Sequence, residues 1–179
     1  MQDILFKLKG SNFEGQIERE LYYMLDGYGK IYQSVHLYSH TLKRVTEIDL
    51  LVVTPKKIYC IEAKSFRTSL EGAMHMEMWN GKSNRYLTKI YNPYFQNLAH
   101  IRALKKAFYD EKILLPTIEN FLVVPNSCRK RTDYRHTYKI AELMTVIAQD
   151  RYVGKETIDV ELFDKVLKKV MVDESSLWS

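Results

Sequence analysis

The chain has 179 residues, of which 46% are hydrophobic and 27% are charged, and its formal net charge is +5. This length is typical of one domain with a sizeable core. We find no apolar run long enough to span a membrane and no secretory signal, so we expect a cytoplasmic protein without a membrane partner. Cys60 and Cys128 are too few for a disulfide framework, which favours a reducing compartment.

The first predicted helix follows a capping box, with Ser11 as N-cap and Glu14 three residues later. Glu18 lies at the edge of the apolar stripe of this helix. The stripe has helical spacing and consists of Ile17, Leu21, Met24 and Leu25. Gly27 and Gly29 end the helix.

The rest of the chain predicts strands followed by helices. Residues 30–40 form a strand, and a hairpin follows at 46–64. A smaller hairpin turns at Asn80-Gly81, and its strand buries Met74, Met76 and Met78. Further predicted elements are a helix at 93–112, a strand at 120–126, a basic loop at 127–139, and helices near 138–149 and 159–172. We therefore expect a single α/β domain over 1–179, with a core at about 11–126 and a C-terminal helical extension at about 136–173.

The first hairpin carries acidic residues at its inner end. If Thr54 faces Lys57 across the turn, then Leu51 faces Cys60 and Asp49 faces Glu62. Opposed side chains have Cβ atoms about 4.5–5.5 Å apart, so the two carboxylates would repel each other by roughly 3 kcal/mol at an effective dielectric near 20. Lys64 lies on the same side and offsets part of this repulsion. The alternative to a functional site is that these three residues form a surface ion-pair network at the end of the sheet.

A divalent metal would neutralise the pair fully, and oxygen ligands favour Mg²⁺ or Mn²⁺. No cysteine and histidine pair has zinc spacing, and the histidines are scattered along the chain at His36, His40, His75, His100 and His136. Two carboxylates, a metal and Lys64 point to metal-assisted phosphodiester hydrolysis. Lys64 would position the attacking water or stabilise the transition state, and Glu18 would complete the metal shell or orient its waters.

Asp49, a 12-residue gap and Glu62-Ala63-Lys64 resemble the PD-(D/E)xK nuclease signature. The chain also resembles the nuclease-related domain (NERD) family in an ordered set of stretches: "GQIERELYYML", "TEIDLLVVTPKKIYCIEAK", "LEG", Trp79 and "NPYFQNLAHIRAL". The resemblance implies a restriction-endonuclease-like core of helix, three-stranded meander, helix and strand, with a β-hairpin insertion and C-terminal helices.

Carried over residue by residue, the resemblance implies a metal site at Asp49 and Glu62, with Lys64 catalytic. It further implies that Glu18 is the acid of the first helix and that Gln96 faces the site from the later helix. The family usually has Gly directly before its first-helix Glu. In this chain Ile17 occupies that position and Gly15 lies further upstream.

Other polar residues are open to two interpretations. Glu14 is a rival acid, but its capping role favours Glu18, and Glu47 is interpreted as a salt-bridge residue. Gln96 is equally suited to capping its helix. The basic segment that contains Arg129, Lys130 and Arg131 is either a solvated loop or a set of phosphate contacts.

The leading prediction is a Mg²⁺- or Mn²⁺-dependent deoxyribonuclease whose partner is DNA. One alternative is a non-cleaving nucleic-acid-binding module on the same fold, because a fold does not fix a function. The other is a basic domain that docks an acidic protein. A homodimer, or a helicase or recognition partner, is compatible with each of these predictions.

Overall fold

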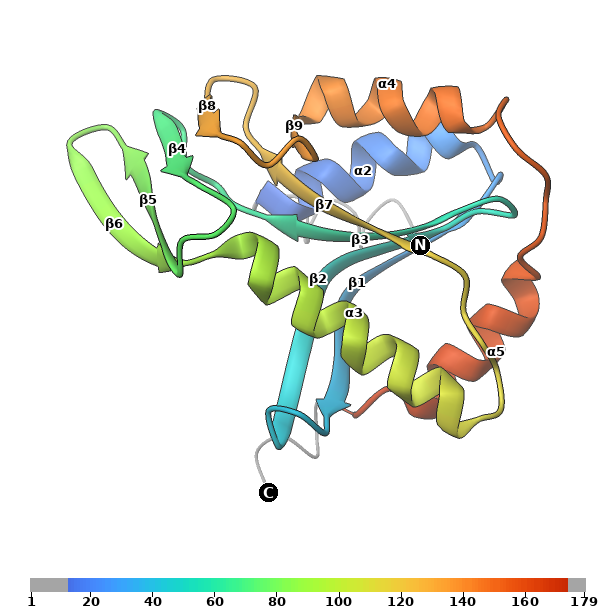
Figure 1. The fold of residues 1–179 in the computed structure, drawn as a ribbon. Coiled ribbons are helices and arrows are strands. Elements are labelled where there is room, and N and C mark those ends of the chain that lie inside the picture. Colours follow the sequence, from blue (N-terminus) through green and yellow to red (C-terminus); the bar gives the residue numbers. More distant parts are fainter. Residues whose placement is uncertain (1–12, 174–179) are drawn as a thin grey trace.

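The computed structural model describes residues 13–173 (Figure 1). The expected Ser11 cap lies outside the described residues. In chain order the elements are α2 (Phe13–Leu25), β1 (Lys30–Ser39), β2 (Arg44–Val53), β3 (Ile58–Ala63), β4 (Ser69–Gly72), β5 (Met78–Ser83), β6 (Tyr86–Tyr91), α3 (Pro93–Asp110), β7 (Ile118–Val124), β8 (Arg129–Thr132), β9 (Thr137–Lys139), α4 (Ile140–Asp150) and α5 (Val160–Val170).

The core is a five-stranded sheet with helices on both faces. Its strand order is β1-β2-β3-β7-β9, in which β1, β2 and β3 form an antiparallel meander and β7 and β9 run parallel to β3. One face packs against α3 and α5, and the other face packs against α2 and α4 (Figure 1). This is the α/β core of helix, meander, helix and strand that the sequence predicted.

The predicted register of the β2–β3 hairpin is confirmed. Val53 pairs with Ile58 and Leu51 pairs with Cys60. The ladder ends at the pair of Leu50 and Ile61, so the acidic residues of the hairpin follow its last regular pair. They lie where β2 and β3 begin to separate.

Side-chain alternation along β1 and β2 changes phase at Ser34 and Asp49. Leu50 packs into the core beside α2, whereas Ile48 and its cross-strand partner Val35 pack into the core beside α3. Strict alternation would place Ile48 and Leu50 on one face. Ser34 has a φ of 52°, a conformation that few residues other than glycine adopt. The regular alternation that we expected through Asp49 is therefore interrupted at this residue.

Strands β4, β5, β6 and β8 form a second sheet, here called the wing, with the order β6-β5-β4-β8. It lies at one side of the core (Figure 1). The predicted turn at Asn80-Gly81 is wrong, since both residues belong to β5 and the chain turns at Asn84, whose φ is 53°. Gly81 is needed inside the strand because a Cβ there would lie 2.3 Å from the ring of Phe66.

The inner face of the wing packs onto the end of β7. Leu70 and Trp79 are fully buried there, against Leu122 and Val124. The predicted burial of the methionines is wrong, because alternation puts Trp79 inside and its neighbours outside. Met74, Met76 and Met78 are 42%, 48% and 43% exposed.

The basic segment is not the loop that we predicted. Residues 129–132 form β8, which pairs in parallel with β4, and residues 137–139 form β9 at the edge of the main sheet. Such parallel pairing joins distant segments, and local patterning gives no sign of it.

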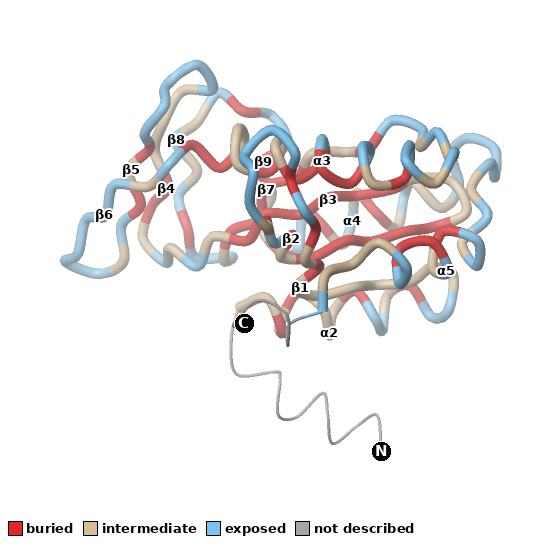
Figure 2. Tube along the Cα trace, turned by 90° about the horizontal axis from the view of Figure 1, so that it is seen from below, coloured by how far each residue is buried: buried red, intermediate tan, exposed pale blue. Residues whose placement is uncertain are grey.

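The two C-terminal helices are integral layers of the fold. Ile140, Leu143 and Ile147 of α4 pack into the core beside α2, whereas Phe163 and Leu167 of α5 pack into the opposite core. Figure 2 shows buried segments in both of these layers. Within residues 13–173, no helix is long and apolar enough to cross a membrane.

The contact between Gly72 and Trp79 provides a test of wing packing. A Cβ at Gly72 would lie 2.2 Å from the indole ring. We expect Gly72→Ala to destabilise the protein by about 1–3 kcal/mol, the usual cost of overpacking, as measured by urea unfolding. Gly154→Asn is the control, since nothing lies within 4 Å of Gly154 and Asn tolerates its positive φ. Equal unfolding midpoints for Gly72→Ala and the wild type would contradict this packing.

Candidate active site

Buried amides fix the position of α3 against the sheet. Asn92 caps the helix by accepting a hydrogen bond from Tyr94 N, and its side-chain N–H groups donate to the carbonyl oxygens of Met74 and Met76. One turn further, the Asn97 amide donates to Cys60 O at 2.7 Å. These bonds connect the start of α3 to both the wing and β3.

Asn97 makes a second set of contacts with β7. Its amide nitrogen lies 2.8 Å from Asn120 Oδ1 and 3.3 Å from the carbonyl oxygen of Phe121, and its Oδ1 accepts from Cys60 Sγ. Burial of these groups is tolerated because their hydrogen bonds are satisfied. The helix therefore has one defined rotation on the sheet.

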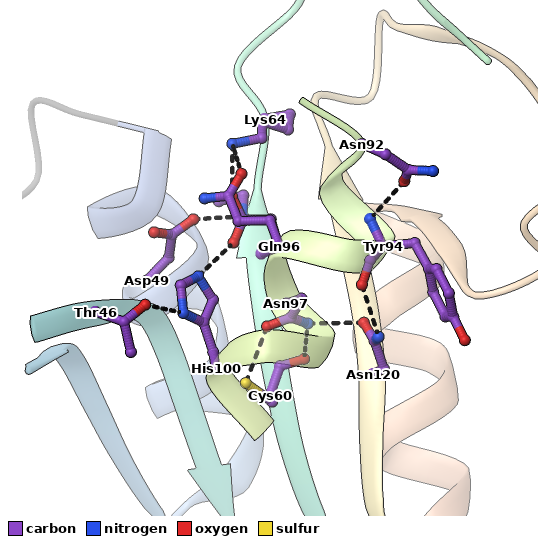
Figure 3. A network of polar contacts seen from close by, with 12 residues as sticks. Thr46, Asp49, Cys60, Lys64, Asn92, Tyr94, Gln96, Asn97, His100 and Asn120 are labelled. Atoms are coloured by element: carbon purple, nitrogen blue, oxygen red, sulfur yellow. Dashed lines mark hydrogen bonds and ion pairs between the residues drawn. The ribbon is translucent and has the colours of Figure 1, made fainter. Parts of the chain in front are cut away.

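That rotation directs Gln96 and His100, which are four residues apart and share a helix face, toward the end of β3 (Figure 3). Gln96 Oε1 accepts from Lys64 Nζ at 3.3 Å. Lys64 Nζ also lies 2.5 Å from Glu62 Oε1. Glu62 is completely buried, whereas the Lys64 side chain is 20% exposed. The cation therefore lies between a buried carboxylate and solvent.

Asp49 lies at the same end of the hairpin. Its Oδ2 accepts a hydrogen bond of 2.8 Å from Ala63 N. The pKa of Asp49 is raised to about 7, chiefly by burial and next by the charges of Glu62 and Glu14, while the Ala63 N–H and Lys64 act in the opposite direction. The carboxylates of Asp49 and Glu62 thus interact electrostatically, although the two residues do not form a pair in the β2–β3 ladder.

The first-helix acid whose charge acts on Asp49 is Glu14, which ranked behind Glu18 in the sequence analysis. Burial raises the pKa of Glu14, as do the charges of Glu47 and Glu62, whereas a hydrogen bond with Gln33 lowers it. Glu18 lies one helical turn away and lines a different cavity of about 450 Å³ together with Lys30 and Asp164. In the sequence analysis Glu14 ranked lower because of its expected capping role, and the sequence alone does not show which turn of α2 meets the hairpin.

His100 is a site residue that the sequence analysis did not select. Its Nδ1 lies 2.6 Å from Thr46 Oγ1, and its Nε2 faces Glu62 Oε2 at 3.5 Å. Among the described residues neither Nε2 nor Oε2 has a hydrogen-bond partner, although both are buried. The four-residue spacing from Gln96 was the available signal, because it places His100 on the face that Gln96 occupies.

The other predicted polar residues have contacts of their own or are exposed. Glu47 faces His36 at 3.6 Å, so it has the salt-bridge geometry expected of it. Lys130 contacts Glu142 at 2.5 Å and the carbonyl oxygen of Thr137. Arg129 and Arg131 are exposed on the opposite face of β8, so the three basic residues do not form one patch.

The carboxylates of this cluster could bind a hard cation such as Mg²⁺ only if water or substrate supplied further ligands. Among residues 13–173, no three side chains of His, Cys, Asp and Glu are arranged to hold a metal ion by themselves. Asp49 and Glu62 supply carboxylate oxygens, and the buried Oε2 of Glu62 has no hydrogen-bond partner among the described residues. Mg²⁺ commonly binds through one or two carboxylates and retains several waters, so the residues present fit such an ion.

The fold and the cluster together define a nuclease-like α/β protein with its polar site at the ends of β2 and β3. The model of the nuclease-related domain (NERD) matches residues 9–125, which is more than half of the chain. The chain therefore belongs to this family. Neither the curated proteins nor the solved structures contain a match.

The raised pKa of Asp49 predicts a stability that depends on pH. The folded protein holds this proton up to about pH 7, whereas the unfolded chain releases it near the usual value of 3.8, so stability falls as the pH rises between these values. Asn at this position stays neutral and still accepts from Ala63 N. With a chelator present, we expect Asp49→Asn to be more stable than the wild type by roughly 2 kcal/mol at pH 8, a value discounted for partial exposure.

The measurement is urea unfolding from pH 4 to pH 8, in which the difference between Asp49→Asn and the wild type should shrink toward pH 4. Glu77→Gln, which changes an exposed carboxylate in the turn before β5, is the control and should show no such trend. A constant difference across this range would contradict the proposed cause.

Proposed function

We propose that the protein is a metal-dependent nuclease that hydrolyses phosphodiester bonds in DNA. The observation that carries this proposal is the grouping of three carboxylates, from Glu14, Asp49 and Glu62, near the ammonium of Lys64, which contacts Glu62 and acts through its charge on the other two. Such an excess of partly buried negative charge lowers stability and is retained where it binds a cation. Membership of the nuclease-related domain family supports the same chemistry.

Each side chain has a distinct role in this proposal. Asp49 and Glu62 would hold Mg²⁺ or Mn²⁺, which when bound lowers the pKa of a water ligand and neutralises charge on the scissile phosphate. Lys64 donates hydrogen bonds to the charge that develops on the phosphate oxygens. Gln96 orients the Lys64 ammonium by accepting from it.

Glu14 and His100 influence the two carboxylates that would bind the metal. Glu14 adds negative charge beside Asp49 and favours the binding of a cation. His100 lies against the second oxygen of Glu62 and is itself held by Thr46. A residue that fixes the direction of a metal-binding carboxylate commonly changes affinity or activity by 10- to 100-fold when it is altered.

The decisive test is the cleavage of plasmid and linear DNA by Lys64→Ala. We expect the wild type to cleave with Mg²⁺ or Mn²⁺ and to stop when a chelator is added. We expect Lys64→Ala to lose about 10²–10³-fold in rate, as when a fixed donor to a transition state is removed, while its circular dichroism is unchanged. Lys105→Ala, an exposed lysine on α3, is the matched control and should cleave normally.

Two results would reject this mechanism. Persistent metal-dependent cleavage by Lys64→Ala would exclude the lysine from the reaction. Tight DNA binding by the wild type without cleavage would indicate the non-cleaving module instead. A parallel RNA substrate tests the choice of DNA, since faster cleavage of RNA would overturn it.

The first-helix acid is tested by a matched pair of substitutions on α2. We expect Glu14→Gln to reduce metal-dependent cleavage by about 10-fold or more, because it removes a charge beside Asp49. Glu18→Gln, one turn along the same helix, should retain the wild-type rate. The readout is the initial rate over a Mn²⁺ titration, in which Glu14→Gln should also require more metal. Equal rates for the two variants would remove Glu14 from the site.

A further inference from the structure

The two faces of the wing differ in composition. Along β5, Trp79 and Gly81 are buried, whereas Met78 and Lys82 are exposed. The pairing of the four strands extends this alternation across the sheet. The outer face consequently carries Ser69, Glu71, Met78, Asn80, Lys82, Leu87, Lys89, Tyr91, Arg129 and Arg131.

Positive charge dominates this outer face. Glu71 is the one acidic residue in the four wing strands. It lies 3.2 Å from Arg131, an exposed contact of the kind that contributes little to stability. Among the described residues, Lys82, Lys89 and Arg129 form no ion pair.

The register sets the spacing of the cations. Ser69 pairs with Arg129 on one side and with Lys82 on the other, so these two cations are two strand spacings apart, about 9.5 Å. Lys89 pairs with Asn80 and is therefore a diagonal neighbour of Lys82, about 7–8 Å away. Each such pair repels by roughly 0.5 kcal/mol in water, a cost that a bound polyanion removes.

We propose that the outer face of the wing is the surface on which the sugar–phosphate backbone of a nucleic acid docks. The phosphates are contacted by Lys82, Lys89, Arg129 and Arg131. Such contacts do not depend on the base sequence of the nucleic acid. Lys130 takes no part, since it lies on the inner face and contacts Glu142. This inference rests on the proposed nuclease function and adds to it the surface that holds the substrate.

The wing is joined to the active site by two short connections. Ser69 follows Lys64 by five residues, and Gln96 follows Tyr91 by five residues. Five residues span at most about 18 Å, so Ser69, which lies between Arg129 and Lys82 in the wing, is within this distance of Lys64. A strand of B-form duplex advances 3.4 Å along its axis per phosphate, so the middle of the row would lie at most about five phosphates from the cleaved bond.

The outer face also carries exposed apolar side chains on β5 and β6. Met78 pairs with Tyr91, and both are exposed, at 43% and 49%. Leu87, which pairs with Lys82, is 66% exposed. An exposed tyrosine on a flat sheet offers a ring on which a base of a single strand stacks, whereas phosphate contacts serve single strands and duplexes alike.

The test compares two double variants that remove the same charge. Lys82→Ala/Lys89→Ala changes the wing, and Lys105→Ala/Lys165→Ala changes exposed lysines of α3 and α5. Binding of a fluorescent DNA duplex and of a single strand is measured by anisotropy, with a chelator, between about 50 and 200 mM salt. We expect the wing variant to reduce the slope of log K against log salt by about 1.8 for the duplex, or about 1.4 for the single strand.

The control variant should retain the wild-type slope and affinity. An equal loss of affinity in both variants would show that the effect depends on net charge alone. An unchanged affinity in the wing variant would show that the wing does not contact the DNA. Either result overturns the inference, as does an absence of DNA binding by the wild type at low salt. Tyr91→Leu distinguishes a single-stranded from a duplex substrate. If this variant binds the single strand more weakly but binds the duplex normally, bases of the single strand stack on Tyr91.

Cleavage kinetics distinguish this inference from the proposed function. The wing variant should show a raised KM and an unchanged kcat, since its residues do not touch the reacting atoms. If the wing variant reduces the slope as expected but neither the wild type nor any variant cleaves DNA, the docking surface is upheld and the nuclease function fails. If Lys64→Ala abolishes cleavage while the wing variant matches the wild type in slope and KM, the docking surface alone fails.

Discussion

The position of the candidate site depends on the buried amide of Asn97. This side chain bonds to β3 through Cys60 and to β7 through Asn120 and Phe121, and thus sets the rotation of α3 on the sheet. Gln96 and His100 follow from that rotation, because they occupy the adjacent face of the helix. An unpaired amide at this depth costs several kcal/mol, so alternative rotations of α3 are strongly disfavoured. The precision of the polar site is therefore a property of the core beneath it.

The site itself works against the stability of the fold. Glu62 is buried beside one cation, and the pKa values of Asp49 and Glu14 are raised by burial and by neighbouring carboxylates. A domain is stable by only 5–15 kcal/mol, so this cost is a considerable fraction of the total. Here it is offset by the dense packing of β2 and β3, in which every residue of β3 is buried. The arrangement is thus consistent with a site shaped by cation binding.

The parts of the fold and of the candidate site that depend on neighbouring residues in the chain could be predicted from the sequence. The spacing of Asp49, Glu62 and Lys64 around a short turn determined their proximity, since the register from Val53 to Leu50 follows from that turn. The choice between Glu14 and Glu18 could not be made, because both lie on one side of α2 and only its docking selects the turn. His100 was missed for a similar reason, because its partners Thr46 and Glu62 come from other elements. The wing was misassigned because β4 and β8 pair across a long sequence separation, and such parallel pairing leaves no alternating pattern of its own.

One strand of the wing lies outside the region of the chain that matches the family. The family match ends at residue 125, so β4, β5 and β6 lie within it and β8 lies beyond it. Lys82 and Lys89 therefore come from the matched region, whereas Arg129 and Arg131 are added by a strand that completes the sheet. Close ring contacts of Trp79 with Gly72 and of Phe66 with Gly81 fix the inner face of this sheet. Because that face is fixed, the cations on the outer face keep a constant relation to Lys64. A rigid surface binds a polyanion with less loss of conformational entropy than a mobile basic loop, which is the advantage of placing these charges on strands.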